Sequence, residues 1–175
     1  MKITKKVIQF PVGGHKAAAI LNVPEQAEGK KNPAIVCVHP GSSCKEQTAG
    51  IYAEKMAENG YVTIVFDASC QGESGGEPRF AEFPAQRVAD IHCAVDYLTT
   101  LDFVDENRIG VLGVCAGGGY AVNAAMSDHR IKAVSTVVGA NIGRVQRESC
   151  GDIIQMMEAA GKQRTAYPAA SDHCG

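Results

Sequence analysis

Cys115 stands in a pattern that is typical of a catalytic nucleophile. It follows the apolar run 109–112 and precedes an alanine-rich segment, with Gly113 and Gly117 two positions away on either side. A sharp turn between a strand and a helix crowds these two positions, and glycine has no side chain to clash there. Such a turn exposes the central thiol, and the start of the helix favours its thiolate form. The spacing therefore predicts a strand, a nucleophile at Cys115 and a helix.

The segments around this turn predict an α/β fold. An antiparallel hairpin is expected first, from strands 3–10 and 15–23. Strands and helices then alternate, with strands at 33–38, 61–66, 108–113 and 131–138 and helices at 48–59, from Pro84 onwards and after Cys115. This order implies a mostly parallel sheet with helices on both faces. The loops after the parallel strands then meet at one rim, which brings residues 39–44, 67–83 and Cys115 together.

The C-terminal part of the chain has a weaker pattern. Past Gly139 the sequence becomes polar, and the helix predicted there covers residues 152–160. We expect residues 1–175 to form a single, partial domain in which residues 141–175 are an atypical C-terminal tail.

Composition and charge exclude several classes of function. The chain is 45% hydrophobic and 21% charged, with a formal net charge of −2, so we expect no nucleic-acid or membrane partner. A membrane-spanning segment and a signal peptide are not predicted, which favours a cytoplasmic protein. The seven cysteines form no Cys-x-x-Cys pair or zinc-type cluster, so we expect reduced thiols, no metal site and no cofactor.

Three motifs occur in register along the chain: the loop His39-Pro-Gly41, Asp67 with Gly72-x-Ser74-x-Gly76, and Gly113-Val-Cys115-Ala-Gly117-Gly118. From about residue 3 to residue 140 this order resembles the α/β-hydrolase superfamily, in particular its dienelactone-hydrolase-like branch. The resemblance implies a hydrolase acting on a small carboxylic ester, lactone or thioester through a covalent acyl-enzyme. It also implies a nucleophile, an acid and a histidine in that chain order.

The predicted site consists of Cys115 and the backbone around it. The N–H of Ala116 and an N–H near Gly41 or Ser42 are candidates to bind the oxyanion of a tetrahedral intermediate. His39 and Ser74 are candidates for substrate binding, although both also suit a role in shaping the rim loops.

The general base is the difficulty. The resemblance implies an acid and a histidine on loops after two further strands, which the sequence past Val138 does not predict. His129 is expected at the opposite rim, because it lies between the elbow helix and the next strand. One interpretation is a shortened cysteine hydrolase with an incomplete triad. In the other, Asp152 or Asp172 folds back with His173 to complete it.

Two alternatives to a hydrolase remain. One is a catalytically inactive fragment that at most binds a ligand or a partner chain. The other is a dinucleotide-binding loop, but Gly113-x-Cys115-x-x-Gly118 lacks the middle glycine of that motif. The resemblance also implies that residues 131–138 form an uncovered edge strand, which predicts self-association.

Overall fold

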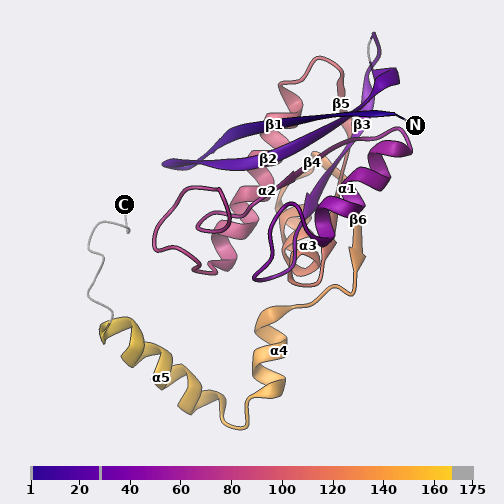
Figure 1. The fold of residues 1–175 in the computed structure, drawn as a ribbon. Helices are drawn as coiled ribbons and strands as arrows, with labels where there is room; N and C mark the ends of the chain where they lie inside the picture. The colour runs from indigo at the N-terminus through magenta and orange to yellow at the C-terminus, as the bar shows by residue number, and fades with distance from the viewer. Residues whose placement is uncertain (1, 28, 167–175) are drawn as a thin grey trace. The chain divides into compact units, whose positions relative to one another are not determined.

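The computed structural model describes residues 2–27 and 29–166 (Figure 1). The chain divides into two compact units, of which the first ends at Asn141 and the second begins at Ile142. The first unit contains all three sequence motifs. The prediction of a single partial domain with a tail from residue 141 stays a prediction.

The first unit is built on a mixed six-stranded sheet, which confirms the α/β prediction and the N-terminal hairpin. The strands are β1 (Ile3–Val12), β2 (His15–Pro24), β3 (Asn32–Val38), β4 (Val62–Phe66), β5 (Val104–Val114) and β6 (Ile131–Val137). Their order across the sheet is β1-β2-β4-β3-β5-β6. β1 pairs with β2, and β2 with β4, in antiparallel fashion, whereas β4, β3, β5 and β6 run parallel.

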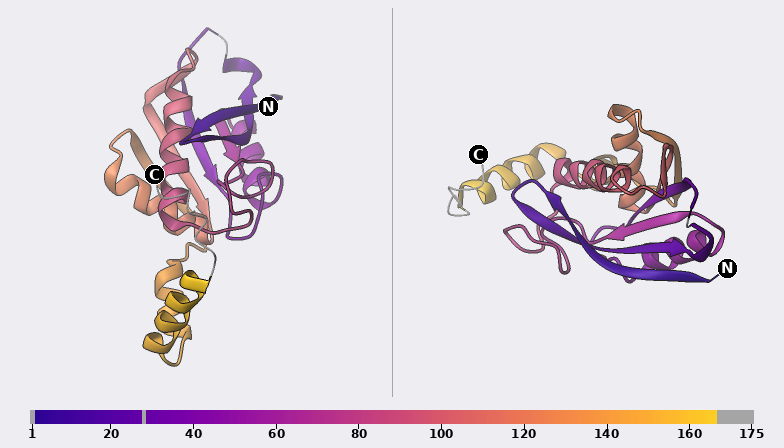
Figure 2. Two further views of the ribbon diagram at one scale, coloured as in Figure 1. Left: turned by 90° about the vertical axis from the view of Figure 1, so that its left-hand side faces the viewer. Right: turned by 90° about the horizontal axis from the view of Figure 1, so that it is seen from above.

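Helices cover both faces of this sheet, as predicted (Figure 2). Besides the short 3-10 helix η1 (Glu25–Ala27), the unit contains α1 (Thr48–Glu58), α2 (Pro84–Thr99) and α3 (Ala116–Ser127). α1 lies on one face, where Ala49 and Ala53 pack against Cys37, Val65 and Leu112 of the sheet. α2 and α3 contact each other on the opposite face. The small buried residues of α1 let the helix approach the strands closely.

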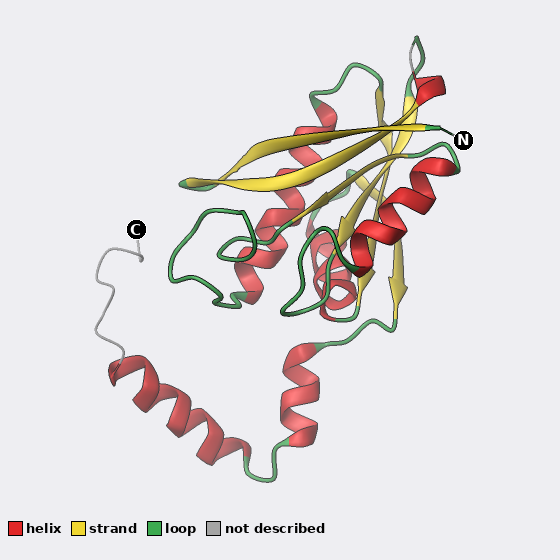
Figure 3. Cartoon of the chain, in the orientation of Figure 1, coloured by secondary structure: helices red, strands yellow, loops and turns green. Residues whose placement is uncertain are grey.

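The boundaries differ from the predicted ones where polar residues hide the pattern. β5 begins at Val104, four positions before the predicted start at Arg108. The prediction began too late because exposed polar residues interrupt the apolar pattern of this strand. In the second unit, α4 (Ile142–Ser149) was not predicted, and the expected helix 152–160 extends over Ile153–Ala166 as α5 (Figure 3). α4 has no buried residue, and an Arg144–Glu148 ion pair one turn apart supports it.

Among the described residues, none of the helices combines the length and the apolar character needed to cross a membrane.

Candidate active site

The turn at Cys115 has the backbone that the glycine spacing predicts. β5 ends at Val114 and α3 begins at Ala116, and Cys115 between them has φ 55° and ψ −120°. A side chain at positive φ is strained and needs support from its surroundings. Here the Cys115 N–H donates to Val137 O, and the Cys115 carbonyl accepts the N–H groups of Gly118 and Ala140, each at 2.9 Å. The end of β6 and the segment after it thus hold the turn in place.

Glycines make this turn possible because backbone passes close on both sides. A Cβ at Gly113 would lie 2.2 Å from Gly117 O, and a Cβ at Gly117 would lie 2.4 Å from Val38 O. A Cβ at Gly119, a glycine to which the sequence analysis gave no role, would likewise lie 2.3 Å from Ala140 O. The end of β3, the turn and the segment after β6 therefore come together at one rim.

The loop after β3 reaches the first residue of α3. A Cβ at Gly41 would lie 3.7 Å from the Cβ of Ala116, which is an ordinary van der Waals contact. The next residue, Ser42, has a positive φ of 53°. The structure therefore brings Gly41 close to Ala116, and the binding of an oxyanion by their N–H groups stays a prediction.

His39 is buried at the base of this loop, with a side chain that is 1% exposed. Its Nε2 accepts the Ala68 N–H at 3.1 Å, so Nδ1 carries the hydrogen and donates to Pro40 O at 2.6 Å. Burial, and then the nearby Arg87 guanidinium, lower the pKa of His39 from 6.5 to about 4. These contacts give His39 a role in holding two rim loops together, and its contact with substrate stays a prediction.

Ser74 is also buried, with 1% of its surface exposed. Its hydroxyl accepts the Ala18 N–H at 2.8 Å and donates to Asp67 O at 2.6 Å. Ser74 thereby links the rim loop to β2 and to the end of β4, and its binding of substrate likewise stays a prediction.

A buried arginine of α2, which the sequence analysis missed, contacts both the loop after β3 and the helix α3. Arg87 donates to His39 O at 2.6 Å, and its guanidinium carbon is 5.0 Å from the ring centre of Tyr120. The Tyr120 hydroxyl donates to Glu82 Oε1 at 2.9 Å, and burial together with this bond raises the pKa of Tyr120 to about 12. An arginine in an amphipathic helix ordinarily lies on the exposed face, so the sequence carried no signal for its burial.

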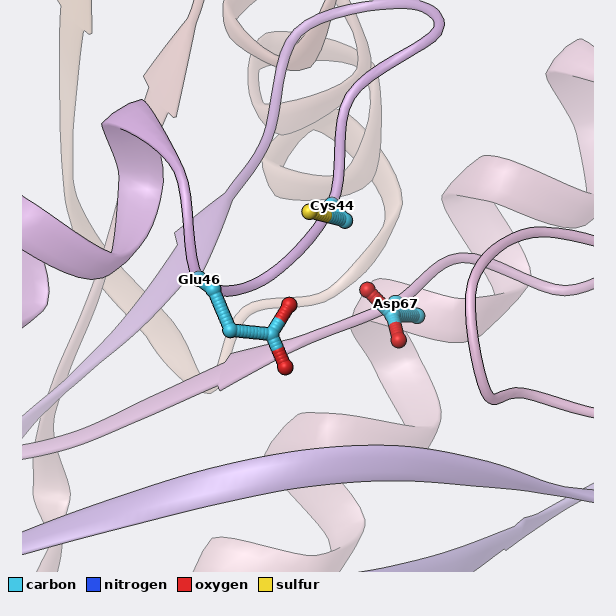
Figure 4. Close-up of side chains that lie close together, drawn as sticks. All are labelled: Cys44, Glu46 and Asp67. Carbon is cyan, nitrogen blue, oxygen red and sulfur yellow. The ribbon is translucent and has the colours of Figure 1, made fainter.

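Cys44, Glu46 and Asp67 place potential metal-ligand atoms within 4.8 Å of one another (Figure 4). Lys45 Nζ, however, forms ion pairs with Glu46 at 2.7 Å, Asp67 at 2.8 Å and Glu73 at 2.7 Å. Burial lowers the pKa of Lys45, but hydrogen bonds to these carboxylates outweigh burial and raise the pKa overall. The ammonium group already supplies the positive charge that these carboxylates bind.

Within the described ranges, no histidine is hydrogen-bonded to the Cys115 thiol. His129 precedes β6, which runs parallel to β5, so it lies at the rim opposite Cys115, as predicted. Asp152 caps α5, where its carboxylate accepts the N–H groups of Ile154 and Gln155. Asp172 and His173, the other members of the alternative triad, lie outside the described residues.

Comparison with protein families identifies the architecture around this turn. Residues 13–145 match the model of the X-Pro dipeptidyl-peptidase (S15) family. The chain belongs to this family. This match confirms the predicted α/β-hydrolase superfamily for the S15-family chain. Solved α/β hydrolases share its fold.

Individual relatives match most of the chain. The uncharacterized protein YcjY of Escherichia coli K12 is 52% identical over 143 residues, covering 82% of this chain and 47% of YcjY. The crystal structure of PA2218 from Pseudomonas aeruginosa has a TM-score of 0.87 at 38% identity, covering 94% of this chain and 54% of PA2218. The thiohydrolase aneE of Aspergillus aculeatus is 32% identical over 138 residues, covering 77% of this chain and 43% of aneE. The S15-family chain thus resembles hydrolase-type proteins, and it spans about half the length of the curated relatives it matches.

Proposed function

We propose that this chain cleaves a small carboxylic ester, lactone or thioester through an acyl-cysteine formed at Cys115. The observation that carries the proposal is the positive φ of Cys115 at the junction of β5 and α3. A strained turn of this kind presents a nucleophile at the rim of the sheet, next to the N-terminus of a helix. The name thiohydrolase, borne by a relative that matches 77% of the chain, supports the same class of reaction.

In the proposed reaction the Cys115 thiolate attacks the carbonyl carbon of the substrate. A C–S bond forms to the enzyme, and the carbonyl oxygen becomes an oxyanion, which the N–H groups of Ala116 and of Gly41 or Ser42 stabilise. Collapse of this intermediate breaks the C–O or C–S bond to the leaving group. The alkoxide or thiolate that leaves takes a proton from water. Hydrolysis of the acyl-cysteine then requires an activated water.

Deacylation is the weak step of the proposal, because no histidine in the described part of the chain is hydrogen-bonded to Cys115. We therefore expect the chain to acylate faster than it deacylates. With an activated aryl ester, product appears in a burst of up to one equivalent, followed by slow turnover.

A stopped-flow burst assay with an aryl acetate tests the nucleophile. Cys115→Ala abolishes the burst, and mass spectrometry detects one added acetyl group on Cys115 in the unmodified chain. Cys93→Ala is the matched control, because Cys93 is another half-buried free cysteine, located on α2. A burst of the same size in Cys115→Ala would show that another group is the nucleophile.

The alternative is a catalytically inactive chain that binds a ligand or a partner chain. The ring of His39, the histidine of the rim loops, is hydrogen-bonded to Ala68 and Pro40 rather than to Cys115, which favours this alternative. It predicts that the burst assay detects no acyl-enzyme, while the thiol of Cys115 still reacts with an alkylating reagent.

We also propose a cytoplasmic location. The six cysteines in the described residues are free thiols, which fits a reducing compartment.

A further inference from the structure

Lys45 is a buried lysine at the end of the loop that follows β3. Its side chain is 2% exposed, and its ammonium group contacts the carboxylates of Asp67, Glu46 and Glu73. Asp67 is as buried as Lys45, whereas the side chains of Glu46 and Glu73 are 55% and 72% exposed. Lys45 and Asp67 therefore form the buried centre of this cluster, and the two glutamates connect it to solvent.

Asp67 connects two rim loops through their backbones. Its Oδ1 accepts the Lys45 N–H at 2.8 Å, and its Oδ2 accepts both Lys45 Nζ at 2.8 Å and the Glu73 N–H at 2.9 Å. The second loop bends around the carboxylate at Gly72, where φ is 48° and a Cβ would lie 2.3 Å from Asp67 Oδ2. One carboxylate thus holds the loop after β3 and the loop after β4 at the same time.

The first of these loops carries the proposed oxyanion donors. Lys45 stands four residues after Gly41 and three after Ser42. Gly41 in turn contacts Ala116, the first residue of α3. The helix α1 begins at Thr48 and packs closely behind the loop, because a Cβ at Gly50 would lie 2.4 Å from Lys45 O. A shift at Lys45 therefore reaches Gly41 through a few residues of backbone.

We propose that Asp67 and Lys45 are positioning residues that set the distance between the Gly41–Ser42 backbone and the Cys115 turn. The inference rests on the proposed function, because it assigns these residues a role in acylation. Neither side chain needs to touch the substrate. Preorganised N–H donors stabilise an oxyanion only when they are held where the negative charge develops. A loosened loop therefore reduces stabilisation of the acylation transition state, while the reactivity of the thiol itself changes less.

Two reactions of Cys115 separate positioning from general damage. Acylation by an aryl ester passes through an oxyanion, whereas alkylation by iodoacetamide displaces iodide at a saturated carbon and does not. In Asp67→Asn the amide keeps an acceptor but loses the charge, and we expect the burst rate to fall about 10- to 100-fold, short of the full loss of a donor. The rate of alkylation at Cys115 is expected to stay within about twofold.

A second variant keeps the buried charge and so lowers the risk of unfolding. Lys45→Arg retains a cation beside Asp67 but changes its geometry, and we expect an acylation defect smaller than that of Lys45→Met. Lys55→Met is the control, because Lys55 forms an exposed pair with Glu58 on α1. It leaves both rates unchanged. Equal loss of acylation and alkylation in Asp67→Asn, or loss of neither, overturns the inference.

Hydrogen exchange tests the positioning of the loops even if the proposed acyl-cysteine function is wrong. If the unmodified chain shows no burst, the acyl-cysteine proposal is wrong, and the loops are then compared directly. Asp67→Asn is expected to speed amide exchange at residues 41–45 and 72–73 at least about tenfold. Unchanged exchange in both segments overturns the inference whether or not the chain is an enzyme.

Discussion

His39 illustrates how one buried side chain fixes its own protonation state. Its Nε2 accepts the Ala68 N–H and its Nδ1–H donates to Pro40 O, so the neutral ring satisfies both neighbours. A second proton on Nε2 would remove the acceptor for Ala68 and place a cation beside Arg87, which lies 3.3 Å from both ring nitrogens. The folded protein therefore resists protonation of this ring.

We expect this resistance to make stability depend on pH. The pKa of His39 is about 4 in the folded state and near 6.5 in the unfolded chain, which therefore binds the proton more tightly. The free energy of unfolding falls by about 3 kcal/mol as pH drops from about 6.5 to about 4, and this term is constant below that range. Urea denaturation across the range measures it.

His39→Gln removes the titrating group and is expected to flatten this part of the pH profile. His129→Gln is the control, since His129 is exposed in the turn before β6 and keeps the slope of the unmodified chain. An identical slope in His39→Gln would assign the pH dependence to other groups.

At the scale of elements, buried polar groups fasten the rim loops to the sheet. Ser74 links the loop after β4 to β2 through Ala18, and Asp67 links the loops after β3 and β4. Asp90 on α2 accepts the N–H of Ser69 at 2.8 Å in a similar way. These bonds satisfy backbone groups that the loops bury, which would otherwise carry a desolvation cost.

We predict that Ser74→Ala destabilises the fold. The Ala18 N–H loses its acceptor in a buried site, at a cost of about 1–3 kcal/mol in the free energy of unfolding. Chemical denaturation measures this loss, and Ser127→Ala on the exposed end of α3 serves as the control. A normal stability with a raised KM would instead support direct contact between Ser74 and substrate.

At the scale of the whole molecule, the two edges of the sheet differ. The β1 edge carries Lys5, Lys6 and Pro11, residues that discourage pairing with another strand. β6 pairs with β5 alone within the described ranges, and its sequence Ile131-Lys-Ala-Val-Ser-Thr-Val137 contains one charge. Exposed apolar side chains on and after this strand, Val134 at 39% and Val138 at 80%, add to its tendency to pair.

We therefore expect self-association through β6. Light scattering after size-exclusion chromatography is predicted to give a mass that rises with protein concentration. Val134→Lys places a charge on the edge and lowers the measured mass toward that of the monomer. Val122→Lys on α3, where Val122 is 47% exposed, is the matched control and leaves the association unchanged. A concentration-independent monomer would contradict this prediction.

Residue patterns along the chain predict those parts of the molecule that depend on local interactions. The glycines around Cys115 predicted the turn, because the close backbone approach leaves no room for a Cβ at positions 113 and 117. Continuous apolar runs predicted β3 and β4, and the alternation of strands and helices predicted the sheet with its two helical layers.

The roles of the polar residues at the rim depend on contacts between distant parts of the chain. Lys45, Asp67 and Arg87 carry charges that are ordinarily exposed, and their burial depends on partners that come from distant segments of the chain. His39 and Ser74 were predicted beside the substrate, but their hydrogen-bond partners appear only once β2, β3 and β4 lie side by side. A local pattern encodes the shape of a turn, whereas the environment of a charge is set by long-range packing.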